Sequence, residues 1–160
     1  MRPLPLCPVV HMWARTVESD RLKNAGIKAV TVRDDGYPPH LKQIHARPPL
    51  LFVKGDLLPE DERSVAVVGT RKASGYGRQV AAALAGDLAR AGVTVVSGLA
   101  LGIDGVAHDA SRQAGGRTIA ILCSGLDVMY PRAHKDLADR VAERGALVSE
   151  FPTGMEPLPG

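Results

Sequence analysis

The chain has 160 residues, of which 45% are hydrophobic and 4% aromatic, enough for one compact domain with a buried core. A formal net charge of +3 suits a polyanionic ligand but is also common in ordinary proteins, so charge alone decides nothing. The sequence lacks a disulfide framework and lacks the run of roughly 20 apolar residues that a membrane span needs. We therefore expect a soluble, cytoplasmic protein that does not contact a membrane.

Residues 1–60 are predicted to form a short N-terminal arm or subregion. Prolines interrupt this segment repeatedly, and only Lys28–Val32 and Leu50–Val53 are typical of strands. Prolines also break the apolar start of the chain, which therefore does not resemble a signal peptide. The polar stretch Pro59–Arg63 separates this subregion from residues 61–160, which we expect to form the main domain.

From Ser64 onward, short apolar runs alternate with segments of helical spacing. The predicted elements, in chain order, are a strand at Val65–Val68, a helix at Gly77–Ala91, a strand at Val93–Val96, a helix at Asp104–Ala114, a strand at Thr118–Leu122, a helix at Lys135–Arg144 and a strand at Ala146–Ser149. Gly92, Gly115 and Gly145 follow the three helices as C-cap glycines. This alternation predicts an α/β fold, with a mostly parallel open sheet and helices on both faces.

In such sheets, ligands bind at the carboxyl ends of the strands, where the strand order reverses. The first loop at this edge, Gly69–Gly77, lies between a strand and a helix, which favours anion binding by backbone N–H groups and by the Arg71 guanidinium. Turn glycines beside an exposed arginine explain the same residues equally well. The loop matches neither the dinucleotide fingerprint nor the P-loop, so no cofactor is expected.

The second loop, Ser97–Gly105, repeats the design, with glycines, an apparent N-cap at Asp104 and then a helix. Two such loops side by side would form adjoining anion sites. Asp104 and His108 are four residues apart and share a helix face, but no third ligand or nucleophile accompanies them. We interpret Asp104 as a cap and His108 as its partner or as a partner of a neighbouring loop, and we expect neither a metal site nor a catalytic pair.

The third loop combines flat side chains with positive charge. Tyr130 and Pro131 are able to pack against a base or to wall a pocket, and Arg132 and Lys135 follow them. A proline turn before a solvated helix start accounts for this loop equally well.

Together these residues resemble the DprA/Smf family of DNA-processing proteins. The resemblance covers roughly residues 36–160 and is carried by motifs in the family's order, namely Val67–Arg71 with Ser74 and Gly77, Ser97–Asp104 with His108, Gly115–Ile119, Gly125–Asp127, Tyr130–Pro131 and Ser149–Glu150. It implies a Rossmann-like domain that binds single-stranded DNA without catalysis, forms a homodimer and loads a RecA-type recombinase during natural transformation and homologous recombination. By motif position, the implied DNA-binding residues are Gly69, Thr70, Arg71, Ser74, Gly77, Ser97, Gly98, Arg132 and, with less support, Lys135.

The family normally continues past this region with an Arg-Asn-Arg motif, a further strand and a further helix. The chain stops at Gly160, so we expect a domain that is incomplete at its C-terminus. Two alternatives remain. One is a nucleotide-binding protein or nucleoside-monophosphate phosphoribohydrolase of the same superfamily, whose Pro-Gly-Gly-x-Gly-Thr loop has only Gly115–Thr118 as its nearest match. The other is a degenerate module with an exposed sheet edge.

Overall fold

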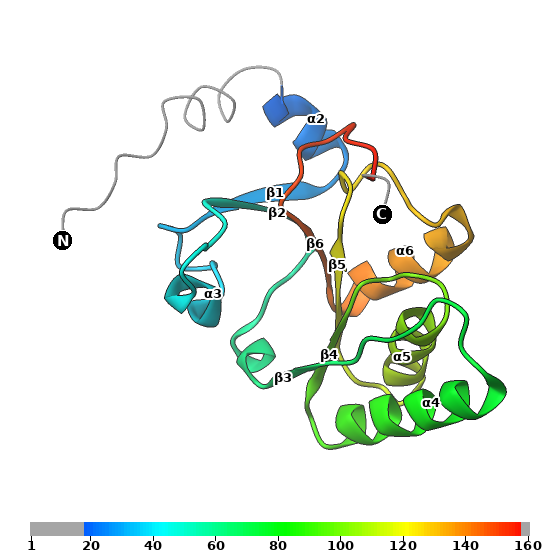
Figure 1. The fold of residues 1–160 in the computed structure, drawn as a ribbon. Coiled ribbons are helices and arrows are strands. Elements are labelled where there is room, and N and C mark those ends of the chain that lie inside the picture. Colours follow the sequence, from blue (N-terminus) through cyan, green and yellow to red (C-terminus); the bar gives the residue numbers. More distant parts are fainter. Residues whose placement is uncertain (1–17, 158–160) are drawn as a thin grey trace.

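The computed structural model describes residues 18–157, which form one mixed six-stranded sheet with helices packed against it (Figure 1). The elements in chain order are α2 (Glu18–Asn24), β1 (Ile27–Thr31), α3 (Pro39–Gln43), β2 (Leu50–Gly55), the 3-10 helix η1 (Pro59–Glu62), β3 (Ser64–Ala66), α4 (Gly75–Arg90), β4 (Thr94–Ser97), α5 (Ile103–Gln113), β5 (Thr118–Leu122), the 3-10 helix η2 (Arg132–His134), α6 (Lys135–Arg144) and β6 (Ala146–Ser149). The strand order is β1-β2-β6-β5-β4-β3. The predicted α/β fold with a mostly parallel open sheet is confirmed.

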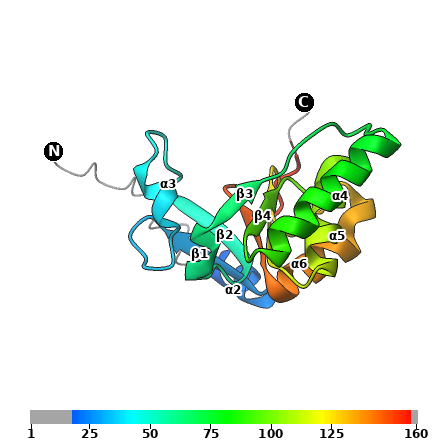
Figure 2. The same ribbon diagram turned by 90° about the horizontal axis from the view of Figure 1, so that it is seen from below.

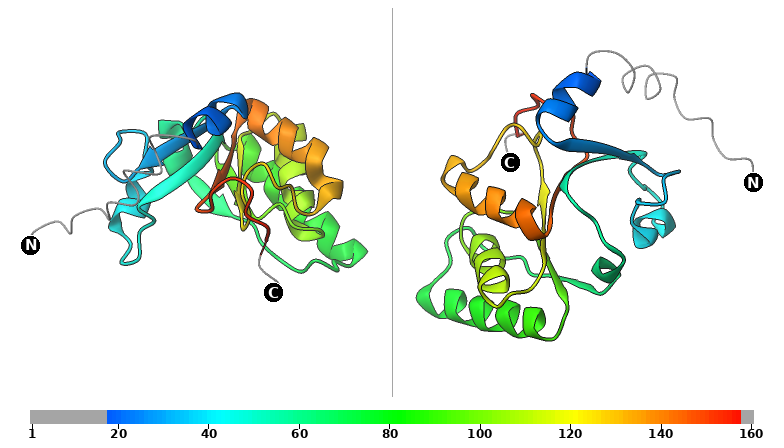
Figure 3. Two further views of the ribbon diagram at one scale, coloured as in Figure 1. Left: turned by 90° about the horizontal axis from the view of Figure 1, so that it is seen from above. Right: turned by 180° about the vertical axis from the view of Figure 1, so that it is seen from behind.

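Strands β3, β4, β5 and β6 are parallel and follow one another across the sheet in sequence order. Right-handed crossovers that all step in one direction place their helices on one face. The long helices α4, α5 and α6 accordingly cover the same face (Figures 1 and 3). The opposite face carries, among residues 18–157, only the short α3 and η1, so the expected helices on both faces are unevenly distributed (Figure 2). The expected reversal of strand order is absent from this parallel part.

Two strands from the predicted N-terminal subregion complete the sheet. β2 pairs antiparallel with β6, and β1 pairs antiparallel with β2. Between them, the Tyr37 side chain is fully buried, and its hydroxyl donates a hydrogen bond to the Pro48 carbonyl at 2.7 Å. The boundary near residue 60 stays a prediction, and the part of the arm before residue 18 lies outside the described residues.

The helix ends show two different uses of glycine. Gly92 and Gly115 have φ values of 70° and 79°, the left-handed conformation expected of C-cap glycines. Gly145 is the C-cap of α6, as predicted, but its φ of −136° is not left-handed. A Cβ at Gly145 would collide with the Thr118 carbonyl oxygen, so glycine is required there for the close approach of the end of α6 to β5.

The sheet separates two kinds of apolar surface. On the helix-covered face, Leu99, Ala120 and Leu147 pack with residues of α2 and α6 in one core cluster. On the other face, Tyr37, Ile119 and Val148 form a second cluster that borders a groove of about 820 Å³. Among residues 18–157, none of the helices combines the length and the hydrophobicity needed to cross a bilayer.

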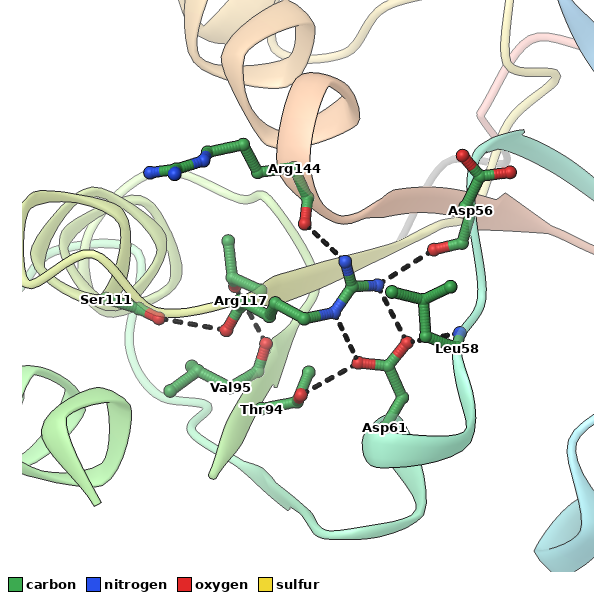
Figure 4. Close-up of polar contacts among 9 residues, drawn as sticks. Asp56, Leu58, Asp61, Thr94, Val95, Ser111, Arg117 and Arg144 are labelled. Atoms are coloured by element: carbon green, nitrogen blue, oxygen red, sulfur yellow. Dashed lines mark hydrogen bonds and ion pairs between the residues drawn. The ribbon is translucent and has the colours of Figure 1, made fainter. Parts of the chain in front are cut away.

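The guanidinium of Arg117 joins the strand ends at the amino edge of the parallel strands (Figure 4). It forms a bidentate ion pair with Asp61, with N–O distances of 2.9 and 2.8 Å, and also donates to the carbonyls of Asp56 and Arg144. Burial would raise the pKa of Asp61, but hydrogen bonds from Arg117, the Leu58 amide and the Thr94 hydroxyl outweigh it and hold this pKa below its usual value. This cluster, the Arg117 clamp, connects residues adjoining β2, β3, β4, β5 and β6.

Replacing Arg117 with methionine should lower the free energy of unfolding by roughly 3 kcal/mol, because it leaves the largely buried Asp61 carboxylate without its cation. Urea denaturation followed by circular dichroism measures this quantity. Arg90→Met is the matched control, since Arg90 pairs with Asp87 on the surface at 62% and 71% side-chain exposure and should cost less than about 1 kcal/mol. Equal losses in the two variants would contradict a special role for the clamp.

A buried histidine should make stability depend on pH. His108 is fully buried, its Nδ1 lies 2.7 Å from the Thr118 hydroxyl, and burial lowers its pKa to about 4 from an ordinary value of 6.5. Since the folded protein resists protonating this imidazole, its contribution to stability is complete above pH 6.5 and is lost as the pH falls towards 4. Between pH 7 and 5 the loss should be about 2 kcal/mol.

The measurement is the free energy of unfolding of the wild type and of His108→Gln at several pH values. The variant should be less stable at pH 7 but should lose about 2 kcal/mol less than the wild type on acidification to pH 5. Parallel pH profiles for the two proteins would refute the assignment.

Candidate functional site

The loops that follow the four parallel strands meet at one edge of the sheet and are joined to one another by hydrogen bonds. The first loop contacts the second through the Ile103 amide, which donates to the Thr70 carbonyl at 3.2 Å. The Gly69 amide also donates to the Asp104 carboxylate at 3.3 Å. The predicted adjacency of the two glycine loops is therefore confirmed.

Glycines in these loops allow the loops to pack closely. A Cβ at Gly69 would lie 2.7 Å from Cγ1 of Ile103, and one at Gly98 would lie 2.8 Å from the Asp104 carboxylate. Gly102 has a φ of 86°, and a Cβ there would collide with the Thr70 carbonyl. The sequence pattern suggested that glycines admit a ligand to the backbone, whereas here the neighbouring loop occupies the space that side chains would fill.

Asp104 and His108 have separate structural partners. The N-cap of α5 is Gly102, and Asp104 lies in the first turn, so the predicted N-cap role of Asp104 is wrong. Its buried carboxylate instead accepts from Gly69 and holds the first loop. His108 contacts the Thr118 hydroxyl at the start of β5 and also the backbone of Ser97, the first residue of the second loop.

The second loop is also joined to the third. Leu99 is fully buried in the left-handed conformation, with a φ of 57°, and its carbonyl lies 2.8 Å from Nδ1 of His134. A carbonyl only accepts, so this nitrogen must be the donor. The sequence analysis missed His134, because nothing in its spacing distinguishes a loop anchor from a solvated histidine.

The third and fourth loops are tied in the same way. The Gly154 amide donates to the Asp127 carboxylate at 2.8 Å, and the Gly125 amide donates to the Met155 carbonyl at 2.8 Å. The Ser149 hydroxyl at the end of β6 donates to the Ser124 carbonyl at 2.7 Å. All four loops therefore form one continuous, internally bonded surface.

Several predicted site residues form hydrogen bonds with the protein's own backbone. Ser74 is the N-cap of α4 and accepts from the Gly77 amide at 3.1 Å. Ser97 is 2% exposed, and its hydroxyl donates to the Val67 carbonyl at 2.6 Å. Thr70 accepts from the Lys72 amide at 3.2 Å. These side chains shape the loops, and the backbone at Gly69 and Gly98 remains exposed beside them.

The predicted cations differ in how free they are. Arg71 and Arg132 are exposed, and within residues 18–157 neither forms an ion pair. Lys135 lies 3.1 Å from Asp139, and this hydrogen bond raises the pKa of Lys135 and lowers that of Asp139. Of these three cations, Arg71 and Arg132 therefore keep a free charge at the loop edge, while the charge of Lys135 is compensated.

The structure also gathers basic residues that the sequence analysis missed. Arg78, His134 and Arg140 line one pocket together with Arg71. The spacing of Arg78 and Arg140 on their helices was compatible with ordinary solvated faces, so only the packing of α4, α5 and α6 reveals that they converge.

Comparison with known proteins places the chain in a family. Residues 28–160 match the family model of DNA recombination-mediator protein A. The chain is 41% identical over 136 residues to the DNA processing protein DprA of Bacillus subtilis, covering 84% of this chain and 46% of that protein. It is 47% identical over 123 residues to protein Smf of Escherichia coli, covering 76% of this chain and 33% of that protein.

Solved structures give the same result. The X-ray structure of DprA from Streptococcus pneumoniae superposes with a TM-score of 0.78 at 36% identity, covering 97% of this chain and 56% of that one. A Helicobacter pylori DprA structure, described by its single-stranded DNA binding mode, superposes with a TM-score of 0.71 at 29% identity, covering 82% of this chain and 59% of that one. The chain thus spans about a third to a half of the length of the two sequence relatives and somewhat over half of the two solved chains. With its matched motifs, sheet and loop edge, the chain belongs to the DprA/Smf family of DNA-processing proteins.

Proposed function

We propose that this chain binds single-stranded DNA through the phosphate backbone at the carboxyl edge of its parallel strands. The observation that carries the proposal is the pair of unpaired, exposed guanidinium groups of Arg71 and Arg132 on loops that are otherwise internally bonded. Exposed backbone at Gly69 and Gly98 lies beside them. Guanidinium groups match phosphate geometry, and hydrogen bonds within the scaffold hold the loops that carry them.

Exposed aromatic rings support a single-stranded rather than a duplex ligand. Tyr130 is 56% exposed in the third loop, and Tyr76 is 78% exposed in the first turn of α4. Unpaired bases stack on such rings with little sequence preference, while cations track the backbone. The H. pylori relative is itself described as binding single-stranded DNA.

The wider role follows from the family. We propose that the protein acts in the cytoplasm in DNA processing for natural transformation and homologous recombination, with a RecA-type recombinase as partner and a homodimer as its assembly. We propose no catalytic step. The stretch nearest to a phosphoribohydrolase loop, Gly115–Thr118, lies between α5 and the start of β5, at the sheet edge opposite to the cationic loops.

Arg71→Ala should weaken binding to a fluorescent oligothymidine about tenfold at low salt, because the central phosphate contact is lost. The slope of log affinity against log salt should fall by about 0.7 for each lost contact with a single strand. Fluorescence anisotropy measures both quantities. Arg63→Ala is the control, since Arg63 is exposed just before β3 at the other end of the strands. Unchanged affinity in Arg71→Ala would refute the site.

Arg132 and Lys135 should contribute unequally. Arg132→Ala should weaken binding about fivefold, or about 1 kcal/mol, because a free guanidinium is removed. Lys135→Ala should change the affinity less than about twofold, because Asp139 already compensates that charge. The same anisotropy titration compares them, and equal losses would show that the ion pair with Asp139 opens when DNA binds.

A further inference from the structure

Four basic side chains surround a pocket over the first turn of α5, on the helix-covered side of the loop edge. The pocket has a volume of about 510 Å³ and is lined by Arg71 from the first loop, Arg78 from α4, His134 from η2 and Arg140 from α6. We refer to it as the arginine pocket. Helices α4, α5 and α6 lie side by side (Figures 2 and 3) and carry more than half of its lining residues, so Arg78 and Arg140 are held on rigid elements.

Part of the arginine pocket is lined by small residues, one of them in close contact with His134. Gly102 and Gly105 line it, and a Cβ at Gly105 would lie 2.6 Å from Cε1 of His134. His134 is in turn held by its hydrogen bond with the Leu99 carbonyl. Backbone and imidazole therefore form part of the lining, beside the apolar side chains of Leu101, Val106 and Leu137.

The arginines of this pocket lack acidic partners. Among residues 18–157, ion pairs neutralise other arginines of the domain, namely Arg90 with Asp87, Arg112 with Asp109 and Arg117 with Asp61. Within the same part of the chain, none joins Arg71, Arg78 or Arg140 to a carboxylate, and Arg78 bonds only to the neutral Ala73 carbonyl. Unpaired guanidinium groups that converge on one cavity are suited to an anion.

Two carboxylates also line the arginine pocket, and they are not equivalent. Asp109 already accepts from Arg112 at 3.0 Å and from Gln113. Asp136 has no such partner among the described contacts, so it opposes the arginines directly. The pocket keeps an excess of positive charge, because its three arginines outnumber its two carboxylates. The charge of Asp136 reduces this excess.

The groove on the other side of the loop edge has the opposite character. Its lining contains the carboxylates of Asp35, Glu62 and Glu150, the carboxylate of Asp61, whose charge Arg117 already compensates, and, among the described residues, neither lysine nor arginine. Phosphates are repelled there and attracted to the arginine pocket. For a DNA strand bound at Arg71, the electrostatically favourable direction therefore leads into the arginine pocket and away from the groove.

We propose that the DNA strand bound at Arg71 continues over α5, between α4 and α6, and places its next phosphate between Arg78 and Arg140. The inference rests on the proposed function and adds to it a second phosphate site and a direction for the strand. Arg71 belongs to both sites, because it lines the pocket from the loop edge.

The test compares the affinity and salt dependence of Arg78→Gln, Arg140→Gln and Arg144→Gln for a single-stranded oligothymidine by fluorescence anisotropy. Arg144 is the matched control, because it is an exposed arginine at the other end of α6. Arg78→Gln and Arg140→Gln should each weaken binding roughly fivefold at low salt and reduce the salt slope by about 0.7. Arg144→Gln should do neither. Losses no larger than that of Arg144→Gln, with Arg71→Ala still impaired, would overturn the second site and leave the proposed function standing.

A second comparison tests the direction of the DNA strand with variants that are expected to gain affinity. A folding defect lowers affinity, so it does not mimic this result. Asp136→Asn and Glu150→Gln each remove one negative charge, on the arginine-pocket side and on the groove side respectively. Asp136→Asn should tighten binding about threefold, whereas Glu150→Gln should leave it nearly unchanged. Tightening by Glu150→Gln alone, or by both variants equally, would overturn the proposed direction.

Discussion

The ion pair between Arg117 and Asp61 is the interaction on which the arrangement of this sheet depends. One guanidinium contacts the carboxylate that precedes β3 and the carbonyls that follow β2 and precede β6, and the same carboxylate accepts from Thr94 at the start of β4. Arg117 itself precedes β5. Because parallel strands that are aligned at their amino ends also present their carboxyl ends together, this clamp positions the loops at the far edge of the sheet.

At that far edge, the polar side chains divide into scaffold and free charge. Asp104, Ser97 and His134 satisfy backbone groups of neighbouring segments, and Ser74 caps its own helix α4, so removing any of them would leave a donor or acceptor without its partner. The glycines belong to the same scaffold, because adjoining loops occupy the space beside them. What remains for a ligand is exposed backbone and the arginines.

The two faces of the sheet also differ in the charged side chains that they carry. All crossovers step in one direction, so the long helices gather on one face and bring their arginines together around α5. The other face retains an apolar groove with carboxylates at its rim. The molecule is thus electrostatically asymmetric about its loop edge, although its formal net charge is only +3. A small net charge is thus compatible with a local excess of positive charge around α5.

The sequence by itself determined the strands and long helices from Ser64 onward and the loop edge at which we propose the DNA site. Alternating apolar and helical segments located β5, β6 and α6 at their observed bounds, because local periodicity reports burial directly. It also singled out Arg71 and the adjoining glycine loops. Only the tertiary structure decided that the helices share one face, that Asp104 holds Gly69 instead of capping α5, and that Arg78 and Arg140 meet Arg71. These features depend on contacts between residues far apart in the chain, and neither residue spacing nor composition predicts such contacts.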